Sequence, residues 1–133
     1  MGGPDKLARR RAAGIMNARE RIAYLFDEGS FVESGLFATS AYPQDSARSP
    51  GDGKLAGFGR IHGREAAVVA NDFTVMGASS SATNMKKIGH MKRTAVSRGI
   101  PLVMLGESSG ARLPDNMGAR GMGTLLAQDP QQY

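Results

Sequence analysis

Two apolar segments joined by one amphipathic helix constrain the fold of this chain more than any other feature. Residues 65–70 are β-prone, and residues 100–105 form a short, continuously apolar run typical of a strand buried on both faces. The stretch between them has helical periodicity and is closed by Gly99 and Pro101. Its apolar side carries Met85, Ile88, Met91 or Lys92, and Ala95. Because a strand–helix–strand unit crosses over right-handed, we predict that the two strands are parallel.

A hairpin precedes this unit. Residues 54–61 alternate small and apolar side chains, and the turn sequence at 62–64 separates them from the strand at 65–70. This pattern predicts two antiparallel strands joined by a tight turn. Residues 38–53 are rich in Ser, Pro, Asp and Gly without periodicity, so we predict a loop there and assign it no chemistry.

The amino-terminal residues 4–28 predict two helices. Asn17 and Glu20 have the spacing of a capping box, and Gly29 is positioned to end the second helix. The apolar face of that helix carries Ile22, Leu25 and Phe26. Arg19 and Arg21 lie off this face, where they are available to solvent, to a ligand or to another subunit.

The predicted topology brings two loops together. Residues 71–81 follow the first strand of the parallel pair, and residues 106–112 follow the second. Loops that leave parallel strands in the same direction emerge at one edge of the sheet. Ligands of open α/β sheets bind at this edge, so the two loops form the two halves of a candidate site.

The turn at 106–112 supports two chemistries. Its backbone N–H groups, at the end of a strand, can stabilise developing negative charge. Residues 106–110 also fit the G-x-S-x-G pattern of a hydrolase nucleophile elbow, with Ser108 as the nucleophile. That architecture places its histidine base after the serine, whereas His62 and His90 both precede Ser108. We favour the backbone donors and keep a Ser108 hydrolase as an alternative.

The backbone donors need no reactive side chain. If a thioester carbonyl lies against the N–H groups of 109–111, loss of a proton from the neighbouring carbon gives an enolate whose oxyanion those groups stabilise. Loss of one such donor costs about 3 kcal/mol of barrier stabilisation. Gly110 permits close approach of the ligand to the backbone. A plain turn between strand and helix also explains Gly110, but it explains the paired serines and Arg112 less well.

Composition excludes several classes of protein. A chain of 133 residues with 41% apolar residues is at most one small globular domain. The absence of cysteine excludes disulfides, thiolate metal ligands and cysteine nucleophiles, and we expect no metal site. No apolar stretch approaches the roughly 20 residues of a membrane span, and the first residues lack the apolar core of a signal peptide. We therefore expect a soluble, cytoplasmic protein without membrane contact.

The net charge of +5 indicates an anionic partner. Aromatic residues make up 6% of the chain and tryptophan is absent, which disfavours nucleic acid. The dense run Arg9, Arg10 and Arg11 falls on a predicted helix, where we expect a solvated face. A small molecule that carries phosphates, such as coenzyme A, is the better candidate.

Six short motifs occur in collinear order along nearly the whole chain. They are Ala-Arg-Glu-Arg-Ile at 18–22, Gly-Ser-Phe-Val-Glu at 29–33, Gly-Asp-Gly at 51–53 with 57–64, Asn-Asp-Phe-Thr-Val at 71–75, Lys-Ile at 87–88 and Ser-Ser-Gly-Ala-Arg at 108–112. Together they resemble the amino-terminal part of the carboxyltransferase subunit of biotin-dependent acyl-CoA carboxylases. This family includes the propionyl-CoA, acetyl-CoA and methylcrotonyl-CoA carboxylases.

The resemblance implies a crotonase-like α/β fold, a spiral of stacked ββα units that this chain contains in part. It implies transfer of a carboxyl group from carboxybiotin, held on a separate biotin carboxyl carrier or biotin carboxylase subunit, to the α-carbon of an acyl-CoA. It also implies a homo-oligomer for the full-length protein and no metal cofactor. We expect the chain alone to have little activity.

The family's Ser-Gly-Gly-Ala-Arg loop, which supplies an oxyanion hole, corresponds to 108–112. This correspondence gives catalytic roles to Ser109, Gly110 and Ala111 and a ligand contact to Arg112. We also expect ligand contacts from Gly77 and Ala78, in the facing loop, and from Arg19. Ser109 replaces the first glycine of the family loop, which leaves the acyl specificity open. Asn17 replaces the family's usual threonine and keeps its capping capacity.

We divide the chain into N-terminal helices at 1–29, a loop-rich linker at 30–53 and a partial crotonase-like domain at 54–133. The sequence after 112 offers few further strands, so we interpret the chain as a fragment. A crotonase-like decarboxylase or acyl-CoA-binding subunit that uses the same turn is an alternative function.

Overall fold

The computed structural model describes residues 1–117 and residue 121. The helices are α1 (Pro4–Ala12), α2 (Ala18–Leu25), α3 (Ala82–Arg98) and α4 (Leu113–Asn116). The strands are β1 (Val32–Ser34), β2 (Lys54–Ile61), β3 (Arg64–Asn71) and β4 (Leu102–Leu105). Three short 3₁₀ helices are η1 (Pro43–Arg48), η2 (Pro50–Gly53) and η3 (Met76–Ala78). The two amino-terminal helices, the hairpin and the strand–helix–strand unit predicted from the sequence are all confirmed.

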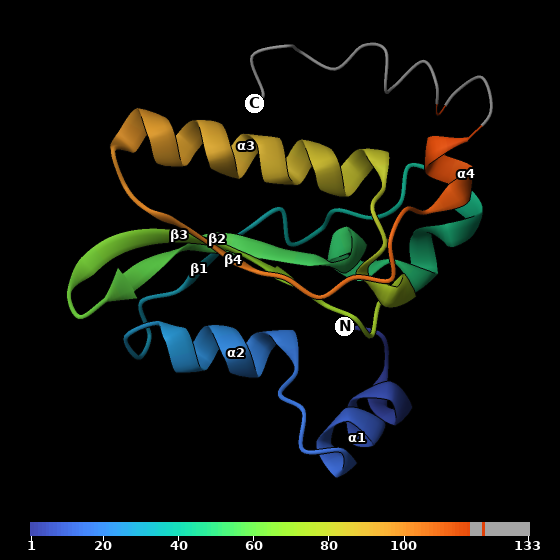
Figure 1. The fold of residues 1–133 in the computed structure, drawn as a ribbon, viewed down its shortest axis with the longest axis horizontal. Helices are drawn as coiled ribbons and strands as arrows, with labels where there is room; N and C mark the ends of the chain where they lie inside the picture. Colours follow the sequence, from blue (N-terminus) through green and yellow to red (C-terminus); the bar gives the residue numbers. More distant parts are fainter. Residues whose placement is uncertain (118–120, 122–133) are drawn as a thin grey trace.

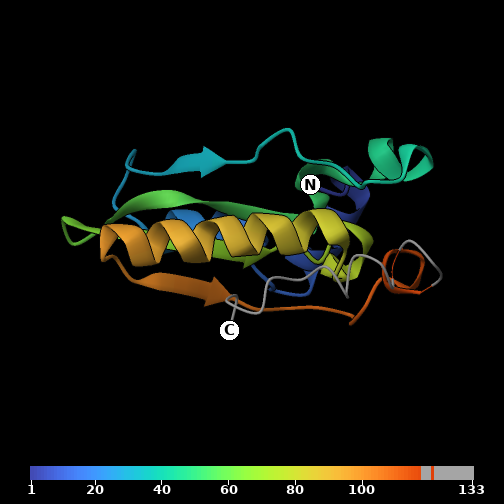
Figure 2. The ribbon, with the colours of Figure 1, turned by 90° about the horizontal axis from the view of Figure 1, so that it is seen from above.

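The strands form one sheet in the order β1-β2-β3-β4. β2 and β3 are antiparallel, and the tight turn between them is the predicted hairpin. β3 and β4 are parallel, with Ala67 opposite Leu102, as the crossover through α3 requires. β1 was not predicted, and it pairs antiparallel with β2 at the opposite edge of the sheet from β4 (Figure 2).

The sheet lies between two helices. α3 covers one face and α2 covers the other (Figure 1). Alternate residues of β2 and β3 face these helices, as the two-residue period of a strand requires. The buried residues on the α2 side are Ala18, Ile22, Phe26, Leu55, Ala66, Val68 and Ala70. Those on the α3 side are Ala56, Ala67, Val69, Met91 and Ala95.

Both long helices have the caps that their sequences predict. The Asn17 side chain accepts hydrogen bonds from the first turn of α2, and Glu20 bonds back to the Asn17 N–H. Gly99 ends α3 in a left-handed conformation. The predicted end of α2 at Gly29 is wrong: the helix ends at Leu25, and Phe26 is already extended. The buried Phe26 ring stacks on Phe31 at a centroid distance of 5.7 Å.

β4 departs from the prediction of a strand buried on both faces. Within the described residues it pairs with β3 alone and forms an edge of the sheet. Met104 is consequently 49% exposed. The continuous apolar run is therefore typical of a central strand, although β4 occupies an edge position in this part of the chain. None of the helices described here is long and apolar enough to cross a membrane.

Candidate functional site

Backbone hydrogen bonds join the two loops at the carboxyl ends of β3 and β4. The Ser109 N–H donates to the Gly77 carbonyl at 2.9 Å. Ser80 bonds on both sides of Ala111: its N–H donates to the Gly110 carbonyl at 2.8 Å, and its carbonyl accepts from the Arg112 N–H at 2.8 Å. The predicted meeting of residues 71–81 with residues 106–112 at one sheet edge is therefore confirmed.

Among residues 109–112, these bonds leave one N–H group available. The Ser109 N–H is bonded to Gly77, and the Gly110 N–H donates to the Ser108 hydroxyl at 3.1 Å. The Arg112 N–H is bonded to Ser80. Among the described residues, no hydrogen-bond acceptor is found for the N–H of the exposed Ala111. The Gly110 carbonyl, which belongs to the same peptide group as the Ala111 N–H, points toward Ser80. Because the C=O and N–H of a trans peptide point in opposite directions, the Ala111 N–H faces away from Ser80.

Ser108 has a structural environment. Its Oγ donates to the Ala78 carbonyl at 3.1 Å and accepts from the Gly110 N–H. His62 lies in the hairpin turn between β2 and β3, at the far end of β3 from this loop (Figure 1). His90 is exposed on α3. Neither histidine is a hydrogen-bond partner of Ser108 in the part of the chain described, so the serine lacks the base that a hydrolase requires.

Gly77 and Ala78 hold the other side of the turn. Gly77 has φ 61°, and a Cβ atom at this position would lie 2.4 Å from the Ser109 Oγ. Ala78 is buried, also has positive φ, and its carbonyl accepts from Ser108 and from the Lys54 ammonium at 2.9 Å. Gly77 therefore shapes the turn by packing closely against Ser109. Ala78 does so through its carbonyl, which binds Ser108 and Lys54 together.

The Arg112 side chain does not face the surface. We predicted a ligand contact for it, but the residue is only 5% exposed and its guanidinium donates to the Asp52 carboxylate at 2.7 Å. Its Nε donates to the Ser79 hydroxyl at 3.2 Å. Asp115 lies 3.9 Å from the same guanidinium. Arg112 therefore anchors the turn to the interior, because the buried Asp52 supplies its counter-charge.

Residues 50–54 contain two charged groups that the sequence interpretation missed. Asp52 is fully buried, and Lys54 and Lys87 are also buried near it. Burial lowers the pKa of Lys54 to about 8, against an opposing influence of Asp52. Burial also lowers the pKa of Lys87, whose ammonium donates to three backbone carbonyls. The available signal was a carboxylate between two glycines in a loop, a pattern typical of a constrained backbone.

A basic cavity of about 420 Å³ lies beside the turn. Its lining is Lys6, Arg9, Arg10, Ala13, Ile15, Phe73, Thr74 and Gly77. Arg10 is largely buried, lies over the Phe73 ring and forms two hydrogen bonds of 2.8 and 2.7 Å with Glu107. The expected solvated face of α1 is thus wrong for Arg10, because Glu107, from the turn, pairs with it.

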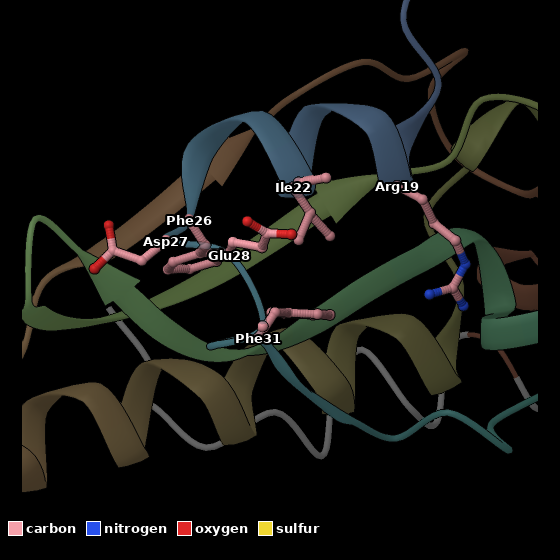
Figure 3. A pocket seen from close by; sticks show the side chains of 8 residues that line it. Arg19, Ile22, Phe26, Asp27, Glu28 and Phe31 are labelled. Carbon is pink, nitrogen blue, oxygen red and sulfur yellow. The ribbon is translucent and has the colours of Figure 1, made fainter.

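Arg19 is not brought to the turn. It lies on α2, where it pairs with Glu33 at 2.9 Å. It lines a separate cavity of about 480 Å³, whose apolar walls include Ile22, Phe26 and Phe31 (Figure 3). Of the seven residues given roles in the sequence analysis, those at 77–78 and 109–112 gather at the sheet edge and Arg19 lies elsewhere.

The contact between Gly77 and Ser109 predicts a coupled mutational effect. Replacement of Gly77 by Ala is expected to lower the free energy of unfolding by about 1–3 kcal/mol, because the new methyl group meets the Ser109 Oγ at positive φ. Adding Ser109→Gly should recover part of this loss, whereas Ser109→Gly alone should have little effect. Urea unfolding of the four proteins measures the coupling. Strict additivity of the two substitutions would contradict the contact.

The lowered pKa of Lys54 predicts a pH dependence of stability. Between pH 8 and about 10.5 the unfolded chain binds a proton that the folded chain has released, so the free energy of unfolding rises with pH. Lys54→Met should reduce this rise, and the remaining slope should include the same-signed contribution of Lys87. Lys86→Met, which removes an exposed lysine of α3, is the control. Equal slopes for the wild-type and Lys54→Met proteins would refute the prediction.

The fold and the site define the class of protein. A parallel β-α-β unit that presents a backbone N–H group at the carboxyl ends of its strands is typical of α/β proteins that bind a ligand oxygen at that edge. The family model for the carboxyl transferase domain matches residues 9–132. The chain belongs to the carboxyl transferase domain family.

Individual relatives agree with this assignment. The chain is 38% identical over 121 residues to the methylmalonyl-CoA decarboxylase subunit alpha of Veillonella parvula, covering 89% of this chain and 24% of the relative. It is 36% identical over 119 residues to the propionyl-CoA carboxylase beta chain of Roseobacter denitrificans, covering 87% of this chain and 23% of the relative. The chain thus spans about a quarter of the length of these relatives.

A solved structure shows the same fold. Transcarboxylase 12S, with methylmalonyl-coenzyme A and methylmalonic acid bound, superposes with a TM-score of 0.82 at 30% identity. The superposition covers 94% of this chain and 25% of the transcarboxylase chain. The crotonase-like α/β fold that the sequence motifs implied is confirmed, with this chain containing part of it.

Proposed function

We propose that this chain is the acyl-CoA-binding segment of a biotin-dependent carboxyltransferase. The observation that carries the proposal is the Ala111 N–H, which is exposed, is without an acceptor among the described residues, and faces away from Ser80. A thioester carbonyl that accepts this hydrogen bond gains stabilisation as its oxygen becomes an enolate oxyanion. Biotin, once carboxybiotin has released its carboxyl group, would accept the α-proton. The nucleophilic carbon that remains would take up the released carboxyl group.

The residues around Ala111 keep its backbone in place. Gly110, with φ 107°, is in a conformation that favours glycine and presents no side chain to the ligand. Ser109 and Ser108 bond to the loop at 77–78 rather than to a ligand. We therefore propose that Ser109, Gly110, Gly77 and Ala78 shape the site. The Ala111 N–H is the group that donates to the thioester oxygen.

The basic cavity supports coenzyme A as the carrier of the acyl group. Lys6 and Arg9 are exposed on α1 and give the cavity positive charge suited to phosphate groups. Gly77 lines the cavity and also bonds to Ser109, so one ligand can extend from the phosphate region to the turn. Carboxybiotin, held on a separate carrier subunit, would supply the carboxyl group. We assign none of the described residues to biotin.

The assembly and location of the complete protein are also part of this proposal. The solved transcarboxylase 12S is described as a hexamer assembly, which supports a homo-oligomer here. We propose a cytoplasmic location, because the acyl-CoA substrate of the proposed reaction is water-soluble. A decarboxylase subunit is the second candidate function, because the chain is 38% identical to the Veillonella parvula subunit and decarboxylation of an acyl-CoA passes through the same enolate.

Ligand binding tests the proposal directly. Propionyl-CoA added to the isotope-labelled chain should shift the amide resonances of Gly77, Gly110 and Ala111 and those of α1, while propionate alone should shift none of them. Resonance changes confined to other surfaces, or none at millimolar propionyl-CoA, would overturn the proposal.

A chimaera separates the two candidate reactions. Residues 1–112 replace the matching segment of the Roseobacter denitrificans propionyl-CoA carboxylase beta chain. Carboxybiotin-dependent formation of methylmalonyl-CoA is expected from a carboxyltransferase segment. A folded chimaera that binds propionyl-CoA but does not form this product would favour the decarboxylase instead.

A further inference from the structure

One buried carboxylate connects both loops of the site. Asp52 lies in η2, between Gly51 and Gly53, and all three residues have positive φ. For a residue other than glycine this conformation costs about 1–2 kcal/mol. Despite this conformational cost, the fold holds the Asp52 carboxylate in a fully buried position.

The contacts of Asp52 reach three separate segments. One carboxylate oxygen accepts from the Arg112 guanidinium at 2.7 Å, and the other accepts from the Ser81 hydroxyl. Its backbone carbonyl accepts from the Asn84 side chain at 3.1 Å. Asp52 thus ties the turn at 106–112 to the loop at 79–81 and to the start of α3.

Arg112 transmits this anchoring to the donor. It directly follows Ala111, its N–H is fixed on Ser80, and its side chain is fixed on Asp52. The remaining contacts of the guanidinium are weaker: 3.2 Å to the Ser79 hydroxyl, 3.5 Å to the Ser79 carbonyl and 3.9 Å to Asp115. Asp52 therefore holds the side chain of Arg112, the residue that directly follows the Ala111 donor, while Ser80 holds its backbone.

We propose that Asp52 is a positioning residue for the Ala111 N–H and acts through Arg112 without touching the ligand. This inference rests on the proposed function, because it concerns the same donor. Its role differs from that of α1, which lines the cavity and has no contact with Asp52 among the hydrogen bonds described. Loss of the Asp52 charge should thus weaken the contact of the thioester with the turn and leave the contacts of the phosphate groups with α1 unchanged.

The experiment compares Asp52→Asn with the wild-type 133-residue chain during titration with propionyl-CoA. In the variant the shifts at Gly110 and Ala111 should be lost, whereas those at Arg9 and Gly77 should remain. The dissociation constant of propionyl-CoA should rise about tenfold, which is the effect expected from the loss of one hydrogen bond. Met91→Ala, which opens a cavity in the core away from the site, is the control for general destabilisation and should keep both sets of shifts in its folded fraction.

A second variant keeps the test informative if Asp52→Asn does not fold. Arg112→Lys retains the positive charge but loses the fork that bonds to Asp52 and Ser79 together, so a smaller loss confined to the same amides is expected. Wild-type shifts at Ala111 in both folded variants would overturn the positioning role, as would loss of the α1 shifts in equal measure. Absence of any shift in the wild-type chain would instead refute the proposed function.

Discussion

Replacement of Arg112 by Met is expected to lower the free energy of unfolding by about 3–5 kcal/mol. The substitution removes the cation that is hydrogen-bonded to the fully buried Asp52 carboxylate, and among the described residues only the Ser81 hydroxyl remains as a side-chain hydrogen-bond partner. The cost arises mainly from burying a carboxylate that has lost its hydrogen-bonded cation and less from the loss of the ion pair itself. Urea unfolding at neutral pH, with fluorescence or circular dichroism detection, measures the change.

Arg48→Met is the matched control for this prediction. It removes the same type of side chain from a pair whose arginine is exposed, in which Arg48 lies 3.7 Å from Asp45. Pairs of this kind contribute about 0–1 kcal/mol, so little change is expected. A similar, small loss of stability for both arginine variants would show that Arg112 is not the main counter-charge of Asp52.

Replacement of Ala111 by Pro in the propionyl-CoA carboxylase chimaera is expected to lower kcat by about 100- to 1000-fold. Proline removes the one N–H among residues 109–112 for which the described residues provide no acceptor. The bonds of Ser80 use the Gly110 carbonyl and the Arg112 N–H and do not involve the Ala111 N–H. Steady-state formation of methylmalonyl-CoA measures the effect.

Two further variants test whether loss of the N–H group is the cause of the lower kcat. Ala111→Ser keeps the N–H and should retain activity within about threefold, because loss of a donor rather than a changed side chain is the proposed cause. Ser108→Ala removes the hydroxyl that a hydrolase would need and should leave carboxyl transfer largely intact. The Ala111→Pro chimaera must first be shown to be folded, by a cooperative urea unfolding transition. Full activity of this folded chimaera would exclude the Ala111 N–H as the oxyanion donor.

The elements with a strong local pattern were predictable from the sequence. The apolar periodicity of α3, its closing glycine and the hairpin turn between β2 and β3 depend on neighbouring residues and were all confirmed. β1 was missed because three residues carry too short an alternation to detect. The edge position of β4 was missed because the sequence shows that this strand is apolar but does not show which strands lie beside it.

The sequence by itself determined the order of strand, helix and strand, and therefore that residues 71–81 and 106–112 share one sheet edge. It did not determine which group of the turn is available or what Arg112 binds. Those facts depend on partners far away in the chain, since Asp52 precedes Arg112 by 60 residues and Gly77 and Ser80 come from the neighbouring loop. A backbone N–H directs its single proton to one acceptor, so only the tertiary structure decides that Ser109 and Arg112 bond within the protein and that Ala111 faces outward.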